Sequence, residues 1–497
     1  MSEYSDGDWH RLHPLTPFLK GGIAFVAIIG VLIVNLRDIL IEQFVGNNEH
    51  NGEILIWLAD NGLVPLAIAG VIVVLALFVL GFYFSWRMHM FRITDEVVEV
   101  RSGILFRTNR KARLDRIQGI NIVRPFLARI FGAAKLEINV AGQDANVQLD
   151  YLSSSSSDEL RREILRLASG TQQQVDAPLA PVAGATVIEQ RLNELVAPEL
   201  DPTLAPTESV VKINLGRLLG SLVLSGFTII AIGLVVGVII AISVTGELFY
   251  LGVAVPFVLG AGSFYIQRFT KSLRYSIAGT PDGVRVGFGL LSTSNETLPP
   301  GRIHSVQISQ PLLWRPAGWW EIKVNRASKS SAQGAAGQAN TTILPVGNLD
   351  DVERVLALVL PSEDEALLRA ALVAKGDDVG FVNSPKRAAI FRWFSWRRNG
   401  VAITPTSILL RKGAIYRELV IVPQARMQSV ALTQGPLRRR FRLADVRLHT
   451  VAGPITPSIG AIDADAATRF FLDVAEAAIW SGTSDTSHRW RSNEATP

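Results

Sequence analysis

The chain has no cysteine among its 497 residues. Disulfide bridges, thiolate metal sites and cysteine nucleophiles are therefore excluded. The sequence also lacks a zinc-binding helix motif, a nucleophile elbow, a phosphate-binding loop and carboxylates paired for catalysis. We therefore predict a protein that is not an enzyme and that carries no metal and no cofactor.

Charge is missing from four long apolar stretches, at residues 21–36, 63–84, 218–244 and 248–266. A helix needs roughly 20 apolar residues to cross a bilayer, and the first stretch approaches this length if Lys20 snorkels and the helix begins near Phe18. A secretory signal peptide is the alternative for this stretch, but no small-residue cleavage site follows it. We expect two transmembrane hairpins, and the absence of ionisable residues from the middle of the spans argues against a transporter or pump.

Basic residues gather at the ends of these stretches. The loop between the first two stretches is mainly acidic, whereas Arg11, Lys20, Arg87 and Arg92 flank the pair. By the positive-inside rule, both ends of the hairpin face the cytoplasm. The net charge of +5 and the mean hydropathy of +0.27 then indicate a multi-pass protein of the cell (inner) membrane with cytoplasmic termini. Its partner is expected to be the lipid bilayer and not nucleic acid.

Residues 94–136 occur three times, at offsets of 186 and 310 residues. Thr94 aligns with Thr280 and Thr404, Gly103 with Gly289 and Gly413, Arg116 with Arg302 and Arg426, and Arg129 with Arg315 and Arg439. The repeat is too long for a solenoid unit, so three copies indicate three small domains.

Each copy begins with strands and ends in a helix. Val98 and Val100 alternate with polar residues before the turn at Gly103, and Leu136 with Ile138 marks a further half-buried strand. Capped amphipathic helices are expected at residues 160–167, 352–360 and 467–478. This order predicts three small β-sandwiches or barrels, each closed by a C-terminal helix.

The third copy has no apolar hairpin in front of it. Residues 362–387 carry too many charges to span a bilayer. Even so, the sequence Phe84, Ser85, Trp86, Arg87 recurs at residues 394–397. Residues 386–398 interleave arginine with Ile390, Phe391, Trp393, Phe394 and Trp396. Such a composition is typical of a segment that lies at the lipid headgroup layer.

Together these features resemble a known family. The opening Trp9, Arg11, Leu12, His13 and Pro14, the apolar hairpins, and three copies with an Arg-Ile/Met-Gln/His step and a Pro-Leu-x-Arg-like turn resemble the YdbT-type bacterial membrane proteins. The resemblance implies three bacterial pleckstrin-homology-like (bPH2) domains, each a bent β-sandwich capped by a helix. It implies no particular activity, because this fold binds lipids, peptides and proteins alike. The predicted fold class is an α+β membrane protein with two transmembrane helical hairpins and three PH-like domains.

Composition sets the predicted domain boundaries. The order is an N-terminal cytoplasmic segment (1–16), transmembrane hairpin 1 (17–86), PH-like domain 1 (87–170), a linker (171–210), transmembrane hairpin 2 (211–268), PH-like domain 2 (269–361), a connector (362–385), PH-like domain 3 (386–481) and a disordered tail (482–497). Within the second copy, the Ser-, Gly- and Ala-rich residues 327–341 predict a mobile hairpin loop.

Arginines and tryptophans are the candidates for binding a lipid or a partner. The basic candidates are Arg129, Arg315, Arg438, Arg439, Arg440 and Arg442, and the aromatic candidates are Trp314, Trp319, Trp320, Trp393 and Trp396. Basic residues near an anionic bilayer contribute roughly 1 kcal/mol each, and the alternative for the Arg438–Arg442 cluster is a solvated face. Trp314, Trp319 and Trp320 either anchor their domain at the interface or belong to its core.

At two further positions of the repeat, a structural role is expected and not a catalytic or binding role. Arg116, Arg302 and Arg426 are present in all three copies and are expected to hydrogen-bond a turn of the shared fold. His304 aligns with Gln118 and Gln428, so a catalytic or ligand role for its imidazole is not expected.

We expect a non-enzymatic, membrane-anchored scaffold that presents three cytoplasmic PH-like domains. Its partners would be anionic lipid headgroups or a protein, such as a smaller PH-like membrane protein. The alternative is a component of an export or envelope-stress system in antimicrobial resistance, which moves or senses a toxic peptide or lipid. That role needs a polar path between the hairpins, which the uncharged spans do not provide.

Overall fold

The computed structural model describes residues 6–13, 64–103, 107–141, 146–169, 211–280, 283–290, 292–299, 301–327, 341–374 and 380–484, with a few isolated positions between them. The first predicted membrane span, the linker at 171–210, residues 328–340 of the predicted loop and the end of the tail lie outside the described residues.

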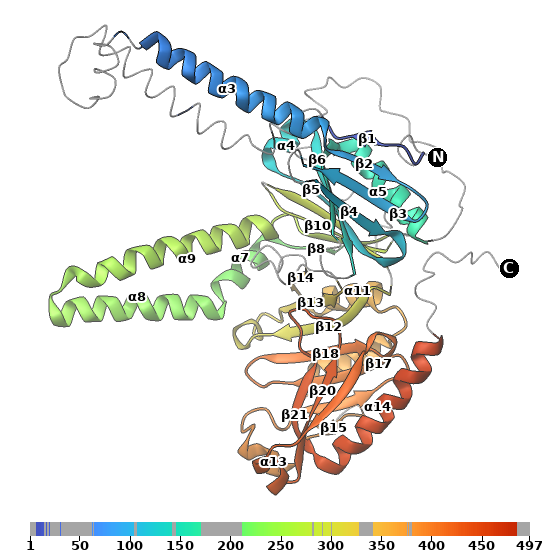
Figure 1. The fold of residues 1–497 in the computed structure, drawn as a ribbon. Coiled ribbons are helices and arrows are strands. Elements are labelled where there is room, and N and C mark those ends of the chain that lie inside the picture. Colours follow the sequence, from blue (N-terminus) through green and yellow to red (C-terminus); the bar gives the residue numbers. More distant parts are fainter. Residues whose placement is uncertain are drawn as a thin grey trace.

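Three β-sheet modules follow one another along the molecule (Figure 1). Module 1 contains β1 (His10–Arg11), β2 (Met90–Ile93), β3 (Val97–Ser102), β4 (Thr108–Arg113), η1 (Leu114–Arg116), β5 (Ile117–Arg124), α4 (Phe126–Ile130), β6 (Ala133–Val140), β7 (Val147–Ser153) and α5 (Ser154–Ser169). Module 2 contains β8 (Val211–Lys212), β9 (Ser276–Thr280), β10 (Gly283–Phe288), β11 (Thr293–Leu298), β12 (Ile303–Gln310), η4 (Leu312–Trp314), β13 (Trp320–Arg326), β14 (Thr342–Gly347) and α11 (Leu349–Val359).

Module 3 repeats this order after the linking helix α12 (Glu365–Val373). It contains β15 (Val382–Asn383), η6 (Lys386–Ile390), β16 (Gly400–Ile403), β17 (Ser407–Lys412), β18 (Arg417–Pro423), η7 (Gln424–Arg426), β19 (Ser429–Thr433), α13 (Pro436–Arg440), β20 (Leu443–His449), β21 (Ser458–Asp463) and α14 (Ala464–Ser484). Strands followed by one closing helix in each copy fit the β-sandwich predicted from the sequence.

The alternating apolar residues form the core of each module, as their spacing predicts. Val98, Ile120, Leu136 and Ile138 are all fully buried in module 1, under the closing helix α5. The closing helices begin where capping residues allow: Asn348 accepts from the N–H of Asp351, whose carboxylate in turn accepts from the N–H of Asn348. Such a capping box satisfies two N–H groups that the first turn would otherwise leave unpaired.

Neighbouring modules share their sheets. The four sheets have the strand orders β1-β2-β3-β4, β7-β6-β5-β11-β10-β9-β8, β14-β13-β12-β18-β17-β16-β15 and β19-β20-β21. Each seven-stranded sheet therefore joins the last three strands of one module to the first four strands of the next. The joining pairs are β5 with β11 and β12 with β18, both antiparallel.

The two junctions between modules have the same register. Asn295 lies opposite Ile122 at the first junction, and Leu419 lies opposite Ile308 at the second. These are equivalent positions of the repeat, because Ile308 follows Ile122 by 186 residues and both Asn295 and Leu419 align with Asn109. The junction is thus a repeated feature of the fold, like the modules themselves.

Helices are inserted between the first and second strands of modules 1 and 2. His10 of β1 pairs with Phe91 of β2, and Val211 of β8 pairs with Ile277 of β9. Between these strands lie α3 (Val64–Arg87) in module 1 and α7 (Leu215–Val223), α8 (Gly226–Thr245), η3 (Leu248–Tyr250) and α9 (Leu251–Ser272) in module 2. The α8–α9 pair and α3 project from one side of the β-sheet body (Figure 1).

The prediction of two transmembrane hairpins is wrong. Among the described residues, only α8 is long and apolar enough to cross a bilayer, and one such helix is weak support for a membrane span. The stretch 218–244 is not one helix, because the hydroxyl of Ser225 caps a new helix by accepting from the N–H of Thr228. Leu218 and Leu222 of the preceding helix α7 are buried against the protein. A multi-pass topology is therefore not supported.

Candidate functional site

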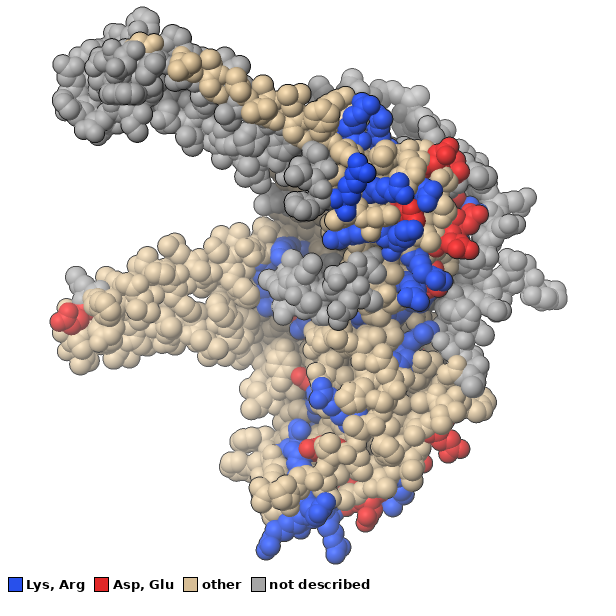
Figure 2. Space-filling model, viewed as in Figure 1, with Lys and Arg blue, Asp and Glu red and all other residues tan. Residues whose placement is uncertain are grey.

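The distal tip of module 3 combines exposed aromatic and basic side chains. It consists of residues 386–398, which fold as η6 and following turns, and of α13 with its C-terminal turn. Ile390, Trp393, Phe394 and Leu437 are between 65% and 75% exposed. Single exposed apolar residues are ordinary, whereas a cluster of them indicates an interaction site. Figure 2 shows basic side chains at this end of the molecule.

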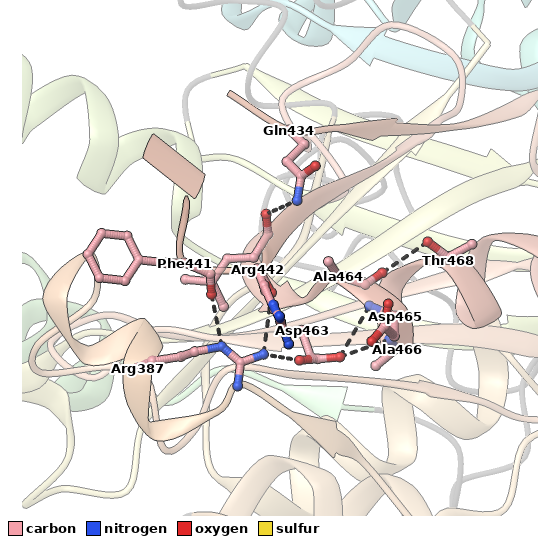
Figure 3. A network of polar contacts seen from close by, with 10 residues as sticks. Arg387, Gln434, Phe441, Arg442, Asp463, Ala464, Asp465, Ala466 and Thr468 are labelled. Atoms are coloured by element: carbon pink, nitrogen blue, oxygen red, sulfur yellow. Dashed lines mark hydrogen bonds and ion pairs between the residues drawn. The ribbon is translucent and has the colours of Figure 1, made fainter. Parts of the chain in front are cut away.

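Arg387 ties the two parts of the tip together. Its Nε donates to the carbonyl of Phe441 at 2.9 Å, and its guanidinium forms an ion pair with Asp463. The rings of Phe391 and Phe441 also pack edge to face, with centroids 5.5 Å apart. Asp463 in turn accepts from the N–H of Ala466 at the start of α14, so the closing helix fixes the tip (Figure 3).

The basic cluster divides into one paired arginine and three exposed ones. Arg438 forms an ion pair with Asp445 of β20, and burial, followed by the charge of Arg392, lowers its pKa. Arg439, Arg440 and Arg442 are exposed. Exposed guanidinium groups can bind carboxylate or phosphate oxygens in bidentate geometry.

The two candidate tryptophans of module 3 have different environments. Trp393 is 75% exposed and stacks on Phe394, with ring centroids 4.8 Å apart. Trp396 is partly buried against Ala388, Leu443 and Ala461, with the Arg397 guanidinium over its ring. Trp393 is therefore available to a ligand, whereas Trp396 holds residues 386–398 on the module.

The tryptophans of module 2 lie away from this tip. Trp314 is buried and donates from Nε1 to the carbonyl of Leu224, between α7 and α8. Trp319 packs on α7 so closely that a Cβ added at Gly220 would lie 2.5 Å from its ring. Trp320 is buried in the core of module 2. Trp314 and Trp319 thus join α7 to module 2, whereas Trp320 belongs to the core of the module.

The other two candidate arginines lie at the junctions. Arg129 is 8% exposed and donates to the carbonyl of Leu290 at 3.4 Å. Arg315 donates to the carbonyl of Ile415 at 3.2 Å. Both carbonyls belong to the turn that precedes the joining strand of the next module. Arg302 contacts the neighbouring module in the opposite direction, since it donates to the carbonyl of Asp115 at 2.9 Å.

The first junction contains buried polar groups that were not among the candidate residues predicted from the sequence. Ser294 donates to Oδ1 of Asn121, and Asn121 donates to Oε2 of Glu137. Burial is the main cause that raises the pKa of Glu137. Arg326 and Glu296 form a buried ion pair beside them. In the sequence, the available signal was the presence of polar residues on strands whose pattern predicts half-burial. This signal does not indicate which module buries those residues.

No group of three or more metal-ligating side chains occurs in the part of the chain that the structure describes. The described tip combines exposed arginine and aromatic side chains, which are groups suited to non-covalent binding. Together with three β-sandwich modules, they define a tandem array of small binding domains.

A family model described as "Bacterial PH domain" matches the chain three times, over residues 51–168, 219–363 and 355–478. The matches cover well over half of the sequence, and the protein belongs to the bacterial PH domain (bPH_2) family. They confirm the repeated PH-like domains predicted from the sequence. PH-like domains are typically binding modules, and no catalytic family is indicated. None of the curated proteins compared with the chain matches it.

Proposed function

We propose that the protein is a scaffold whose module 3 binds the anionic surface of a membrane through its distal tip. The observation that carries this proposal is the juxtaposition of exposed Trp393 and Phe394 with exposed Arg440 and Arg442 on one tip. Aromatic side chains favour the headgroup layer, and arginines are attracted to anionic lipids. The rigid connection of the tip to α14 through Arg387 and Asp463 would hold these groups in one orientation.

The helices support the same location. The side chains of Ile229, Ile232 and Ile239 on α8 are between 57% and 59% exposed. An apolar surface of this kind requires cover by lipid or by another protein. We propose that α8 contributes to membrane association at the cytoplasmic face of the cell membrane, and that the chain is a YdbT-type member of its family.

The absence of cysteine allows a direct test on the full chain. Ser395→Cys, labelled with an environment-sensitive fluorophore, reports on the tip next to Phe394. The labelled protein is reconstituted with phosphatidylcholine alone, or with phosphatidylcholine and phosphatidylglycerol. We expect a blue-shifted emission only where phosphatidylglycerol is present, because only then do the arginines draw the tip to the surface.

Charge reversal identifies the residues responsible. Each arginine is expected to contribute roughly 1 kcal/mol, so Arg440→Glu with Arg442→Glu should weaken the lipid association of the tip at least about 30-fold, since each glutamate is also repelled by the anionic lipid. Arg162→Glu with Arg354→Glu is the matched control, because it reverses two exposed charges on the closing helices of modules 1 and 2. Equal emission in both lipids, or an equal effect of the two double variants, would contradict the proposal.

A further inference from the structure

The array ends in two unmatched strand edges of complementary type. Inside the chain, the first strand of a module's last sheet accepts the fourth strand of the next module. Within the described residues, β4 pairs only with β3, and β19 pairs only with β20. Module 1 therefore retains a free fourth strand, and module 3 retains the free edge that receives such a strand.

The partial exposure of side chains on β19 shows that no strand covers the receiving edge of module 3. Ile120 and Ile122 of β5 and Val306 and Ile308 of β12 are fully buried. Their equivalents on β19, Val430 and Leu432, are only partly buried. The strand β19 contains no charged residue or proline. Proteins usually block a free edge with charges or proline, so an unblocked edge indicates a surface for strand pairing.

The backbone of β19 is oriented for this pairing. Leu448 donates its N–H to Pro457, away from β19, and it lies opposite Val430. In an antiparallel pair, the backbone N–H and carbonyl of two opposite residues either all point toward the partner strand or all point away from it. The N–H and carbonyl of Val430, and of Leu432 two residues on, therefore point outward from module 3.

The strand β4 offers the same groups from module 1. Leu114 donates its N–H to Glu96, toward β3, so the alternation along the strand directs Asn109 and Lys111 outward. In the other modules the equivalents of these two residues pair across the junction: Asn295 with Ile122 at the first and Leu419 with Ile308 at the second. Thr108, Asn109, Arg110 and Lys111 are exposed.

We propose that β4 of a second copy of this chain pairs with β19, so that copies join head to tail through a third junction of the same kind. The repeat then fixes the register: Asn109 lies opposite Leu432, and Lys111 opposite Val430. The charges of Arg110 and Lys111 oppose pairing of β4 with another β4, whereas β19 has no charged residue to repel them.

A second copy is the occupant because the chain itself carries both halves of the contact. The contact is heterologous, so it leaves another free edge at each end and generates a ring or a filament. This inference is independent of membrane binding, since no residue of the register test below belongs to the tip.

Single cysteines in the full, naturally cysteine-free chain test the register. Arg110→Cys in one preparation and Ala431→Cys in another would face each other in a non-hydrogen-bonded pair, with Cα atoms about 4.5 Å apart, which a disulfide can bridge. Thr108→Cys and Thr433→Cys form a second matched pair. Swapping partners, Arg110→Cys with Thr433→Cys and Thr108→Cys with Ala431→Cys, separates the Cα atoms to roughly 7–8 Å. The protein is mixed in detergent and oxidised.

Matched pairs should give cross-linked dimers at least about tenfold faster than swapped pairs, because disulfide geometry tolerates little extra separation. Equal rates for matched and swapped pairs, or no dimer from either, would overturn the proposal.

Sedimentation without cross-linking provides a second measurement. The native chain should show a mass that rises with concentration. Asn109→Pro, which removes an outward N–H at an exposed position, should abolish this rise, whereas Asn109→Ala should retain it. Val430→Pro should act like Asn109→Pro, with Val430→Ala as its control.

Mixing the two proline variants should restore a one-to-one complex, because each keeps the edge that the other has lost. A native chain that remains monomeric at every concentration, or proline variants that associate as the native chain does, would contradict the second copy as occupant.

Discussion

The side chain of Asn325 exchanges two hydrogen bonds with the main chain of Ile455. Its Nδ2 donates to the carbonyl at 2.7 Å, and its Oδ1 accepts from the N–H at 3.0 Å. Asn325 lies in β13 of module 2 and is fully buried, whereas Ile455 precedes β21 of module 3. The side-chain amide thus makes the two hydrogen bonds that a neighbouring strand would make. It fixes a loop of module 3 on the sheet of module 2.

Replacing this amide should weaken the second junction. Asn325→Ala leaves a buried N–H and a buried carbonyl unpaired, at a cost of about 1–3 kcal/mol for each. We expect faster hydrogen exchange at residues 451–457 and a lower urea midpoint. Asn139→Ala is the control, because the Nδ2 of this equivalent residue in module 1 has no partner within the described structure. An equal loss for both variants would argue against the clamp.

The three turn arginines should differ although they occupy one repeat position. Arg129 and Arg315 donate across a junction, whereas Arg439 is exposed. Arg129→Ala and Arg315→Ala should each destabilise the protein by about 1.5–3 kcal/mol, as for a hydrogen bond to a charged group. Arg439→Ala should change the unfolding free energy of dilute protein by less than about 0.5 kcal/mol. Urea unfolding monitored by tryptophan fluorescence provides the comparison, and equal effects at the three positions would contradict it.

His304 should make the second junction sensitive to acid. Burial is the main cause that lowers its pKa from 6.5 to about 4, and it interacts with the backbone of Arg426 across the junction. The folded protein thus resists protonation of the ring. The associated stability is complete above about pH 6.5 and falls by up to about 3 kcal/mol as the pH drops to about 4.

The variant His304→Gln introduces the residue found in the other two copies and should remove this dependence. Urea unfolding at neutral pH and at a pH near the lowered pKa would measure it. Carboxylates titrate in the same range, so the test is the difference between the variant and the native chain. Parallel loss of stability in both proteins would exclude His304 as the cause.

Arg442 has a left-handed backbone conformation, with φ of 51°. The equivalent Gly132 and Gly318 have φ of 64° and 65°. Arg442→Gly should therefore stabilise module 3 by about 1 kcal/mol, because only glycine adopts this conformation without a steric cost. Arg440→Gly, within α13, is the control and should destabilise by roughly 0.5–1 kcal/mol. Thermal unfolding distinguishes the two variants. A loss of stability in Arg442→Gly would contradict the prediction that the backbone of Arg442 is strained.

The repeat predicted the inside of each module well. Alternating residues such as Val98 and Ile120 mark strands because a buried face imposes period two, and they are buried in the structure. Residue 442 is an arginine where the first two copies have Gly132 and Gly318. The structure shows the same turn in all three copies, with residue 442 donating to Arg439 as Gly132 does to Arg129.

The contacts between modules could not be predicted in the same way. Strand edges pair through N–H and carbonyl groups that every residue carries, so the joining of β5 to β11 leaves no mark in the pattern of side chains. The basic cluster of the tip was visible in sequence, but the ion pair of Arg387 with Asp463 joins residues 76 positions apart. The expectation of a single long helix at 218–244 was wrong because Ser225 and Thr228 form a helix cap within it. The apolar composition of the stretch gives no indication of this cap.

The shared register of the two junctions has a consequence for how such a chain can grow. A duplicated module brings with it both a strand that inserts and an edge that receives, so each added copy fits its neighbour without any new interface being selected. Each junction also places the fourth strand of the later module beside the last sheet of the earlier one, which gives the array a direction. If separate chains join through the proposed third junction, lengthening the gene and assembling chains would be two routes to the same array.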